Sequence, residues 1–545
     1  MAPEKELEAQ QDAVAGTTRY GEVKLETGEV VNASGHRQEL ERNFSLFNMC
    51  AVAVVIGNCW AISGATINLS IFNGGAPGVI YEFIVVGVFY LCITVNLAEL
   101  ASAIPSSAGV YHWASVTPGR RAGRALGFFA GYWNAFAYAL GAASLAATAG
   151  SAVLEMWSLT HPGYAFARWH VLVIYLALIW GATAVLLFAN RALPAVNNAF
   201  MALGLLGWLV CVVAVAALPS RGRVVDDDGS SSSSTASGYA SSSFVWKEWQ
   251  NNTGYVSNGL VFVLGMFNGA FNIGTPDCSS HMAEEVPRPS INIPIAMGTQ
   301  MTASFLSTIV YYVVLMYGIT DFDSVLNTTA AFPLTKIYHQ VAGASAPGVS
   351  PAAAAAGAIG LTIVTLLPLV GSQMGAMLTA SRVFWTLARD GATPCAGALA
   401  RVDPRWKNPF NAIVLVAVFC TVMGLVYLGS DAAFAAMVGS FALLTTLSYL
   451  AALVPFALRG RARRLRPGPF FVRGAPGYAL NAVSCGFLLV WLVFYCFPYS
   501  LPVAAADMNY SSAIVGGLTL LVAVWWCCVQ GRYEGPPVIV MSGEM

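Results

Sequence analysis

The sequence predicts an all-α integral membrane protein with twelve transmembrane helices. The 545-residue chain is 57% hydrophobic, only 10% of its residues are charged, and its mean hydropathy is +0.64. Soluble chains carry about a quarter charged residues. Long apolar stretches recur from Phe44 to Gln530, and about 20 such residues suffice to cross the hydrocarbon core as a helix.

Twelve segments have the length and apolar character of a membrane span. They are residues 46–71, 79–104, 126–154, 169–189, 195–218, 257–284, 294–318, 352–386, 410–428, 433–457, 478–498 and 511–529. Because this number is even, both termini are expected on the same side of the membrane.

Lysine and arginine are unevenly distributed among the segments outside the spans. With the N-terminus in the cytosol, 22 of the 27 basic residues fall in or beside cytosolic segments. The largest group lies between the tenth and eleventh spans and consists of Arg459, Arg461, Arg463, Arg464, Arg466 and Arg473. Short basic loops remain in the cytosol, so we expect both termini to be cytosolic.

Three segments outside the twelve-helix domain (44–530) are expected to lack fixed structure. Residues 1–43 form a polar cytosolic tail without the pattern of a signal peptide. Residues 219–256 include the serine-rich tract DDDGSSSSSTASGYASSS and are expected to form a flexible extracellular loop. Residues 531–545 form a cytosolic C-terminal tail. Asn251 and Asn327 are glycosylation candidates in predicted outer loops, whereas Asn509 lies close to the membrane.

The motif content argues against enzymatic, metal-binding and nucleic-acid-binding functions. There is no GxxxxGK[ST] loop, no HExxH and no spaced Cys/His set, so we expect no enzyme, cofactor or metal site. No basic face stands apart from the loops. Ten of the eleven cysteines lie in spans and Cys395 lies in a cytosolic loop, which leaves no outer-loop disulfide. Cys527 and Cys528 are candidates for palmitoylation, with plain packing favoured. The expected partners are the lipid bilayer and a small solute.

The sixth span loses its apolar character halfway across the membrane. Polar residues and helix breakers gather there: Asn268, Gly269, Asn272, Gly274, Thr275 and Pro276. An unpaired backbone group in hydrocarbon costs several kcal/mol unless it faces protein, a cavity or a solute. The interruption therefore predicts a binding site near the midplane.

The first span contains a second interruption, NCWAISGAT, at residues 58–66. If Gly64 is aligned with Gly274, Asn58 falls on Asn268, and residues 44–218 match residues 257–457 as two five-span halves. Each half begins with an interrupted helix. This pattern predicts a 5+5 inverted repeat with broken helices 1 and 6, followed by two extra helices (478–529). Alternatively, the small residues only allow close helix packing.

Several longer motifs resemble the amino acid-polyamine-organocation (APC) superfamily. They are NLAELASAIPSSAGVYHWASV (96–116), HMAEEVPRPSINIPIAM (281–297) and SRVFWTLARDGATP (381–394). GNCWAISGATINLSIFNGGAPGVIYE, PDCSSHMAEEVPRP and FPYSLPVAAADMNYSSAIVGG resemble its fungal choline and GABA permease branch. The resemblance runs from Phe44 to the C-terminus. It implies the LeuT-like (APC) fold and proton-coupled uptake at the plasma membrane.

Polar and aromatic residues near the two interruptions, and on the third span beside them, are the candidates for substrate binding, because polar groups in a membrane are costly. They are Asn58, Trp60, Ser63, Gly64, Thr66, Trp133, Asn134, Tyr138, Phe267, Asn268, Phe271, Asn272, Gly274 and Thr275. A quaternary ammonium such as choline would be held by aromatic faces, for which the candidates are Trp60, Trp133, Tyr138, Phe267 and Phe271; any of them can instead be packing. A GABA-like amino acid would use amides near Ser63 to Thr66 and carbonyls near Asn268 to Phe271.

Transport against a gradient requires a group that binds a coupling ion, and a proton is the expected ion. Asp277 and His281 share a helical face at spacing i, i+4. Glu99 and the pair Glu284 and Glu285 are further candidates, for which the anchoring of cytosolic loops to arginines is favoured. The fifth span carries Asn197 and Asn198 but not the lysine found in some bacterial relatives.

The predicted function is therefore a secondary-active plasma-membrane permease that imports choline or a GABA-like amino acid by alternating access, coupled to protons. The alternatives are a general amino acid or polyamine permease and a nutrient sensor of the same fold. Few acidic residues lie in the spans, which disfavours polyamines, and the short tails disfavour a sensor.

Overall fold

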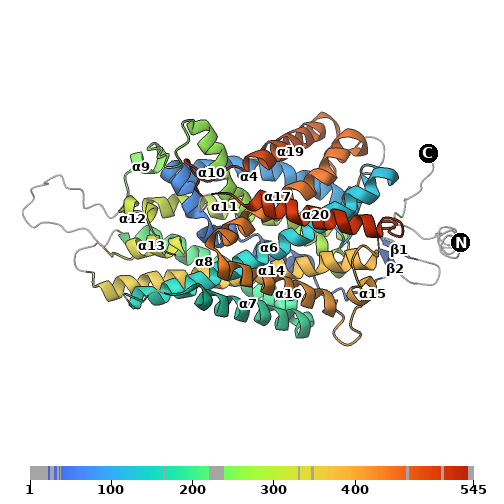
Figure 1. Ribbon diagram of the computed structural model, residues 1–545, viewed down its shortest axis with the longest axis horizontal. Helices are drawn as coiled ribbons and strands as arrows, with labels where there is room; N and C mark the ends of the chain where they lie inside the picture. The colour runs from blue at the N-terminus through green and yellow to red at the C-terminus, as the bar shows by residue number, and fades with distance from the viewer. Residues whose placement is uncertain are drawn as a thin grey trace, which may run out of the picture.

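The computed structural model describes residues 22–24, 30–32, 36, 38–161, 163–164, 166–219, 239–328, 330, 332–344, 349–461, 465–504 and 508–537. The helices lie side by side along the long axis of the molecule (Figure 1). Helices α9, α12 and α13 lie at one end, which we call the α13 end. The labelled N- and C-termini and the strands β1 and β2 lie at the other, which we call the terminal end.

The first five spans are built from seven main segments. They are α2 (Leu46–Ile56), α3 (Cys59–Ile62), the 3-10 turn η1 (Ser63–Ala65), α4 (Ile67–Ala103), α6 (Arg120–Thr160), α7 (Arg168–Phe188) and α8 (Leu193–Ala217). Helix α4 holds the end of the first span and all of the second. Gly75, with φ 65°, turns the chain between them, a backbone conformation that glycine adopts without strain.

The remaining spans follow the predicted order. They are α10 (Asn258–Ile273) with the 3-10 helix η4 (Cys278–Glu285), α11 (Pro289–Tyr317), α14 (Pro351–Arg389), α16 (Phe410–Gly429), α17 (Asp431–Pro455) with the π-helical turn η5 (Phe456–Gly460), α19 (Gly474–Phe494) and α20 (Ser511–Val529). Among the described residues, all twelve predicted spans are present as helices, eleven of them long and apolar enough to cross a membrane and the first supplied by the shorter stretch Leu46–Ile62.

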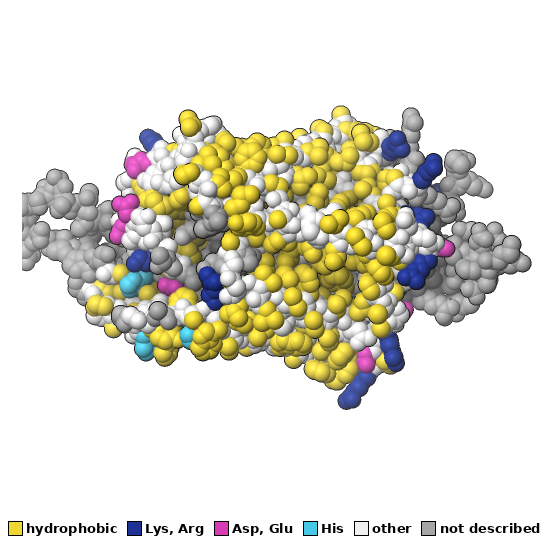
Figure 2. Space-filling view, in the orientation of Figure 1, with side chains coloured by type: hydrophobic (Ala, Val, Ile, Leu, Met, Phe, Trp, Pro, Cys, Tyr) yellow, Lys and Arg dark blue, Asp and Glu magenta, His cyan; other side chains and the backbone are white. Residues whose placement is uncertain are grey.

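Short elements connect the spans. They are α5 (Val110–Val116), η2 (Asn190–Ala192), α9 (Ser242–Trp246), α12 (Phe322–Leu326), α13 (Pro333–Val341), α15 (Ala396–Leu399) and the antiparallel strands β1 (Glu22–Lys24) and β2 (Val30–Asn32). Hydrophobic side chains cover the middle of the molecule, and lysine and arginine gather mainly toward the terminal end in this view (Figure 2).

Parts of the three segments expected to lack fixed structure are packed or paired in the structure. In the N-terminal tail, β1 pairs with β2 and Leu40 is buried against Trp385. In the loop 219–256, Trp246 donates a hydrogen bond to the Tyr317 hydroxyl of α11 at 3.0 Å. In the C-terminal tail, Tyr533 is buried and bonded to Tyr111. Apolar side chains in each segment explain the difference, because their burial offsets the entropy of ordering. The serine-rich tract itself lies outside the described residues.

Candidate functional site

The first span is interrupted between α2 and α3, at Gly57 and Asn58. The carbonyl groups left at the end of α2 are taken up by neighbouring spans. Ser372 of α14 donates to the Val55 oxygen at 2.7 Å, and Ser304 of α11 donates to the Gly57 oxygen. The interruption is thus stabilised by hydroxyl groups of two other spans.

The sixth span is interrupted between α10 and η4, where Thr275 and Pro276 separate the two helical halves. Tyr449 of α17 donates to the Gly274 oxygen at 3.2 Å, and Gln300 of α11 donates to the Thr275 oxygen at 2.9 Å. The predicted interruptions of spans one and six are therefore present.

The exact positions of the breaks correct the sequence alignment. Helix α10 continues through Asn268 and Asn272 to Ile273, and Gly64 lies inside η1. The first-span interruption begins at Gly57. Aligning Gly64 with Gly274 therefore does not superpose the interruption of the first span on that of the sixth. Glycine and asparagine are tolerated inside a tightly packed helix, which is why composition alone misplaced the ends.

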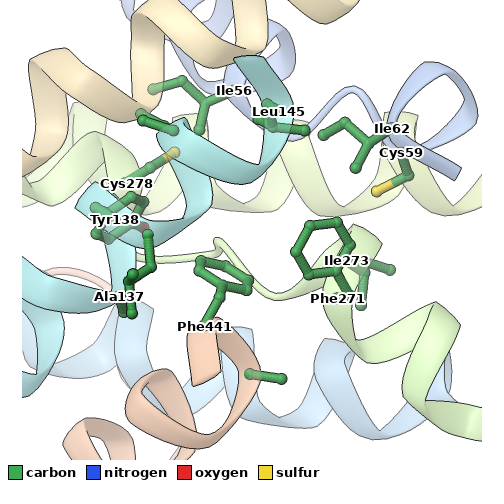
Figure 3. Packing of buried hydrophobic residues seen from close by; sticks show 14 of the residues in the cluster. Ile56, Cys59, Ile62, Ala137, Tyr138, Leu145, Phe271, Ile273, Cys278 and Phe441 are labelled. Carbon is green, nitrogen blue, oxygen red and sulfur yellow. The ribbon is translucent and has the colours of Figure 1, made fainter. Parts of the chain in front are cut away.

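A cavity lies between the two breaks. Its lining residues come from both interrupted spans and from α6, α14 and α17: Ile56, Ile62, Tyr138, Gly141, Leu145, Phe271, Asn272, Thr275, Ser372, Ala376 and Phe441. Figure 3 shows the rings of Phe271 and Phe441 close together, with Tyr138 beyond them. The Phe271 and Phe441 ring centroids are 5.4 Å apart, and those of Tyr138 and Phe441 are 6.4 Å apart. Three aromatic rings thus form one side of a mostly apolar cavity.

The cavity also contains features that favour a positive charge. The C-terminal end of α10 meets it at Phe271 and Asn272, and the C-terminus of a helix carries a partial negative charge. The Oδ1 atom of Asn272 is buried without a hydrogen-bond partner among the described residues. The cavity therefore offers one free acceptor beside the negative end of a helix.

Several predicted binding residues face away from this cavity. Asn58 and Trp60 line a separate crevice against α8 and α11, where the Trp60 ring packs on Tyr311 at 5.4 Å. Trp133 donates from Nε1 to Thr519 of α20 at 3.0 Å. Phe267 packs on Tyr495, nearer the α13 end. Of the five aromatic candidates, only Tyr138 and Phe271 line the cavity, because helix rotation turns the others toward neighbouring spans.

Other candidates form contacts on the α13 side of the cavity. The Thr66 hydroxyl donates to Asn268 Oδ1 at 2.5 Å, and Asn272 Nδ2 donates to the same oxygen at 3.0 Å. Ser63 donates to the Trp60 carbonyl of its own turn. Gly64 packs beneath the Phe332 ring just before α13, and an added Cβ would lie 2.5 Å from its Cζ atom. These contacts close the α13 side of the cavity.

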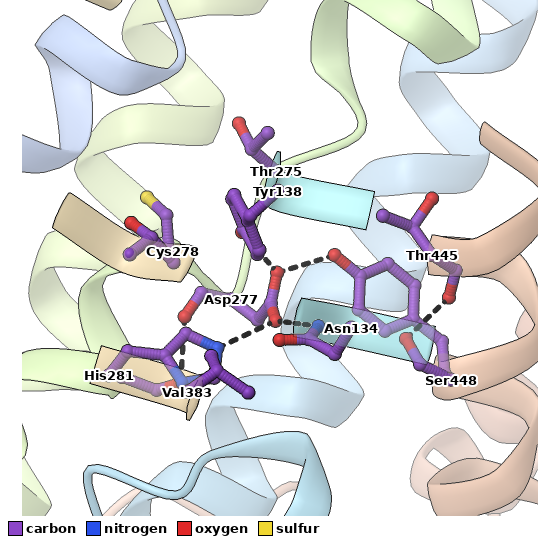
Figure 4. Close-up of polar contacts among 12 residues, drawn as sticks. Asn134, Tyr138, Thr275, Asp277, Cys278, His281, Val383, Thr445 and Ser448 are labelled. Atoms are coloured by element: carbon purple, nitrogen blue, oxygen red, sulfur yellow. Dashed lines mark hydrogen bonds and ion pairs between the residues drawn. The ribbon is translucent and has the colours of Figure 1, made fainter. Parts of the chain in front are cut away.

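On the terminal side of the cavity, Asp277 is the centre of a buried hydrogen-bond network (Figure 4). Its carboxyl accepts bonds from Tyr138 at 2.6 Å, Tyr449 at 2.5 Å and Asn134 at 2.8 Å. His281 Nε2 lies 3.1 Å from the Asp277 Oδ2 atom, and its Nδ1 atom lies 3.1 Å from the Ser107 carbonyl oxygen. The network joins the sixth span to α6, to α17 and to the segment before α5.

The three glutamates predicted to act in coupling or anchoring are each paired with an arginine near the terminal end. Glu99 forms a two-bond ion pair with Arg461, at 2.5 and 2.8 Å. Glu284 pairs with Arg389 at 2.9 Å and Glu285 with Arg382 at 2.8 Å. This is the arrangement expected of loop anchors. Asn197 donates to the Leu193 carbonyl of its own helix, away from the cavity.

Sequence reasoning missed Phe441 and Tyr449 of α17 and Gln300 of α11. Phe441 supplies a cavity wall, Tyr449 bonds to Asp277, and Gln300 supports the sixth-span break. The only available signal was a polar or aromatic residue within an apolar span, which many other positions share.

A helical membrane protein whose interrupted first and sixth spans enclose a cavity has the architecture of a solute transporter. The chain belongs to the amino acid permease family, whose sequence model matches residues 44–520. The resemblance to the APC superfamily is thereby confirmed, and the chain is a multi-pass membrane transporter for a small molecule.

Named relatives cover nearly the whole chain. The choline transporter of Saccharomyces cerevisiae is 28% identical over 502 residues, which are 91% of this chain and 82% of that protein. Amino-acid permease BAT1 of Arabidopsis thaliana is 25% identical over 532 residues, which are 95% of this chain and 98% of that protein. A putative amino acid/polyamine transporter of Macrophomina phaseolina is 26% identical over 477 residues, which are 85% of this chain and 97% of that protein.

Proposed function

We propose that the chain is a secondary-active permease that imports choline across the plasma membrane by alternating access, coupled to protons. The observation that carries this proposal is the group of three rings, Tyr138, Phe271 and Phe441, around one cavity. Ring faces attract a quaternary ammonium, which cannot donate hydrogen bonds. The similarity to a yeast choline transporter supports the same solute class.

The remaining cavity groups suit the rest of a choline molecule. The negative end of α10 favours the cation. The choline hydroxyl is a donor, and Asn272 Oδ1 is an acceptor without a partner in the described structure. Ser372 and Thr275 add hydroxyl groups to a lining that is apolar apart from Asn272 and the Tyr138 hydroxyl.

A GABA-like amino acid is the second candidate, favoured by the same Asn272 acceptor, which an ammonium N–H could satisfy. Its carboxylate would need donors near Ser63 to Thr66. There the Thr66 amide already donates to the Ser63 carbonyl at 3.1 Å, and the carbonyls of Asn268 to Phe271 belong to helix α10. A polyamine is disfavoured because the cavity lining contains no carboxylate. A general amino acid permease and a nutrient sensor remain as alternatives of the same fold.

The coupling proton is assigned to the Asp277 and His281 pair. The Ser107 carbonyl only accepts, so Nδ1 of His281 carries a hydrogen. A second hydrogen must lie between Nε2 and the Asp277 carboxyl for that contact to be a hydrogen bond. The pair thus holds one dissociable proton. Its loss would leave a lone pair facing a carboxylate and disrupt the contact between His281 and Asp277. Asn134 and Tyr138 of α6 donate to the same carboxyl, so we expect inward opening to begin where the sixth span meets α6.

Uptake of labelled choline and GABA into cells that lack their own carriers tests the substrate. We expect choline accumulation that competes with unlabelled choline and increases when the external medium is acidified. Binding of both solutes without uptake would overturn the permease in favour of the sensor. Uptake of GABA without uptake of choline would show that the substrate is a GABA-like amino acid instead.

The substitutions His281→Gln and Asp277→Asn test the coupling. Both variants should keep choline exchange down its gradient and lose accumulation driven by a pH gradient. His339→Gln, which changes a half-buried histidine of α13, is the matched control and should behave like the wild type. Accumulation that persists in both variants and is abolished by a protonophore would show that the proton is carried elsewhere.

A further inference from the structure

Glu82, on α4, is a buried carboxyl group that neither the cavity nor the Asp277 network uses. The residue is 1% exposed, and both carboxyl oxygens lack a hydrogen-bond partner among the described residues. The nearby Ser70 hydroxyl donates to the Gly265 carbonyl instead. No ion pair in the described part of the chain includes it. An ionised carboxylate in such a place costs far more than a neutral acid.

The position of Glu82 is made by the packing of α10 on α4. A Cβ atom added to Gly265 of α10 would overlap the Glu82 carboxyl, and Gly78 leaves room on the other side. The first half of α4 also holds α10 here, because the Ser70 hydroxyl donates to the Gly265 carbonyl at 3.2 Å. The absence of a side chain at Gly265 therefore creates the space that the carboxyl fills.

The neighbouring elements supply no compensating charge. Helix α10 and residues 67–80 of α4 carry no ionisable side chain. Helices α12 and α13 also contact α4 and carry Asp323 and Lys336. Helix α11 carries Tyr311, Tyr312 and Tyr317, of which Tyr312 packs on Phe83 at 5.2 Å. Lys247 and Glu248, which follow α9 at the same end, are exposed. None of these groups forms an ion pair or hydrogen bond with Glu82 in the structure as described.

We propose that Glu82 is a proton-binding site that must be loaded before α10 can pack against α4 and close the α13 side of the cavity. When α10 moves away, water reaches the carboxyl and it can ionise, and closure then requires one proton to return. The site is distinct from the Asp277 and His281 pair on the terminal side of the cavity. Its loading from outside rests on the proposed function as an importer with cytosolic termini, which places the α13 end, opposite the termini, outside the cell.

The proposal predicts that closure of α10 depends on pH without any solute. In lipid nanodiscs, hydrogen–deuterium exchange of peptides from α10 should be measured between pH 5.5 and 8 and corrected for the intrinsic exchange rate. Wild-type α10 should become less protected as pH rises, by up to about tenfold per pH unit once Glu82 ionises. Glu82→Gln, which is permanently neutral, should keep α10 protected throughout.

Two controls keep the test specific. Glu248→Gln removes an exposed carboxylate at the same end and should follow the wild type, and peptides from α16 should not respond in any variant. The proposal is overturned if wild-type α10 shows no pH response, or if Glu82→Gln responds as the wild type does. The measurement uses no solute, so failed choline uptake with a normal exchange result would reject the proposed function alone.

Discussion

At the scale of single residues, the cavity depends on which side chains the neighbouring spans turn toward the breaks. Phe271 was predicted from its place in the sixth span, whereas Phe441 comes from a span with no unusual local signal. Their edge-to-face contact holds both rings against the same space. A methylated cation placed there would touch both rings.

Replacing Phe441 or Phe271 by leucine should weaken choline transport through affinity. Leucine keeps most of the apolar volume and removes the ring face, so we expect the KM for choline to rise roughly tenfold with a smaller change in maximal rate. Competition uptake assays measure this. Phe89→Leu is the control, since Phe89 packs on Phe487 of α19 at 4.4 Å. An unchanged KM in both cavity variants would show that these rings are packing.

His112, in α5, provides a pH-dependent contribution to stability outside the membrane spans. Burial lowers the pKa of His112 to about 4, although the negative charge of Asp390 acts in the opposite direction. In the unfolded chain the histidine binds a proton near pH 6.5. The contribution of neutral His112 to the free energy of unfolding is therefore fully present above pH 6.5, and up to about 3 kcal/mol of it is lost as the pH falls toward 4.

Thermal unfolding of His112→Gln in nanodiscs checks this contribution. The difference in unfolding temperature between wild type and variant should shift in favour of the variant as pH falls from 6.5 to 4, and then level off. A constant difference over that range would contradict a neutral buried His112.

At the scale of elements, the α13 side of the cavity is closed by the fit of α13 over η1. Gly64 permits this fit because the Phe332 ring lies where a side chain would stand. Gly64→Ala should cost about 1–3 kcal/mol in the closed arrangement through overpacking. We expect slower choline uptake and faster hydrogen exchange in α13. Gly298→Ala, with open space around its Cβ position, is the control. Equal effects of the two changes would show that the fit of α13 over η1 does not close the cavity.

The packed parts of the tails show the same dependence on tertiary contacts. Gln38 donates to the Glu284 carbonyl at 2.6 Å, and His36 lies 2.7 Å from an Asp390 carboxylate oxygen. The amino-acid composition of these segments is polar. Their order comes from partners on η4 and beyond α14, hundreds of residues away in sequence, which no local pattern contains.

At the scale of the whole molecule, the orientation in the membrane can be tested at the glycosylation candidates. Asn327 is exposed at the end of α12, whereas the Asn251 side chain is held in a turn by a bond to the Tyr255 carbonyl at 2.8 Å. With cytosolic termini, we expect a glycan on Asn327 and none on Asn251.

A mass shift on gels after glycosidase treatment measures this modification. Asn327→Gln should abolish the shift and Asn251→Gln should preserve it. Proteolytic protection of an N-terminal tag in sealed vesicles provides an independent reading of orientation. A protease-sensitive N-terminus on the outside of intact cells would reverse the proposed topology.

The sequence by itself determined the membrane class, the twelve spans, the two interruptions and the family, because apolar length, helix breakers and motifs are recorded along the chain. It also identified Asp277 and His281 as a pair, since the spacing i, i+4 brings them together. Tertiary structure decided that Trp60 and Trp133 lie outside the cavity and that Phe441 and Tyr449 belong to the site. It also decided that the Glu82 carboxyl has no hydrogen-bond partner within the described ranges. The physical reason is that each helix buries residues around most of its circumference, so only packing selects which of them meet.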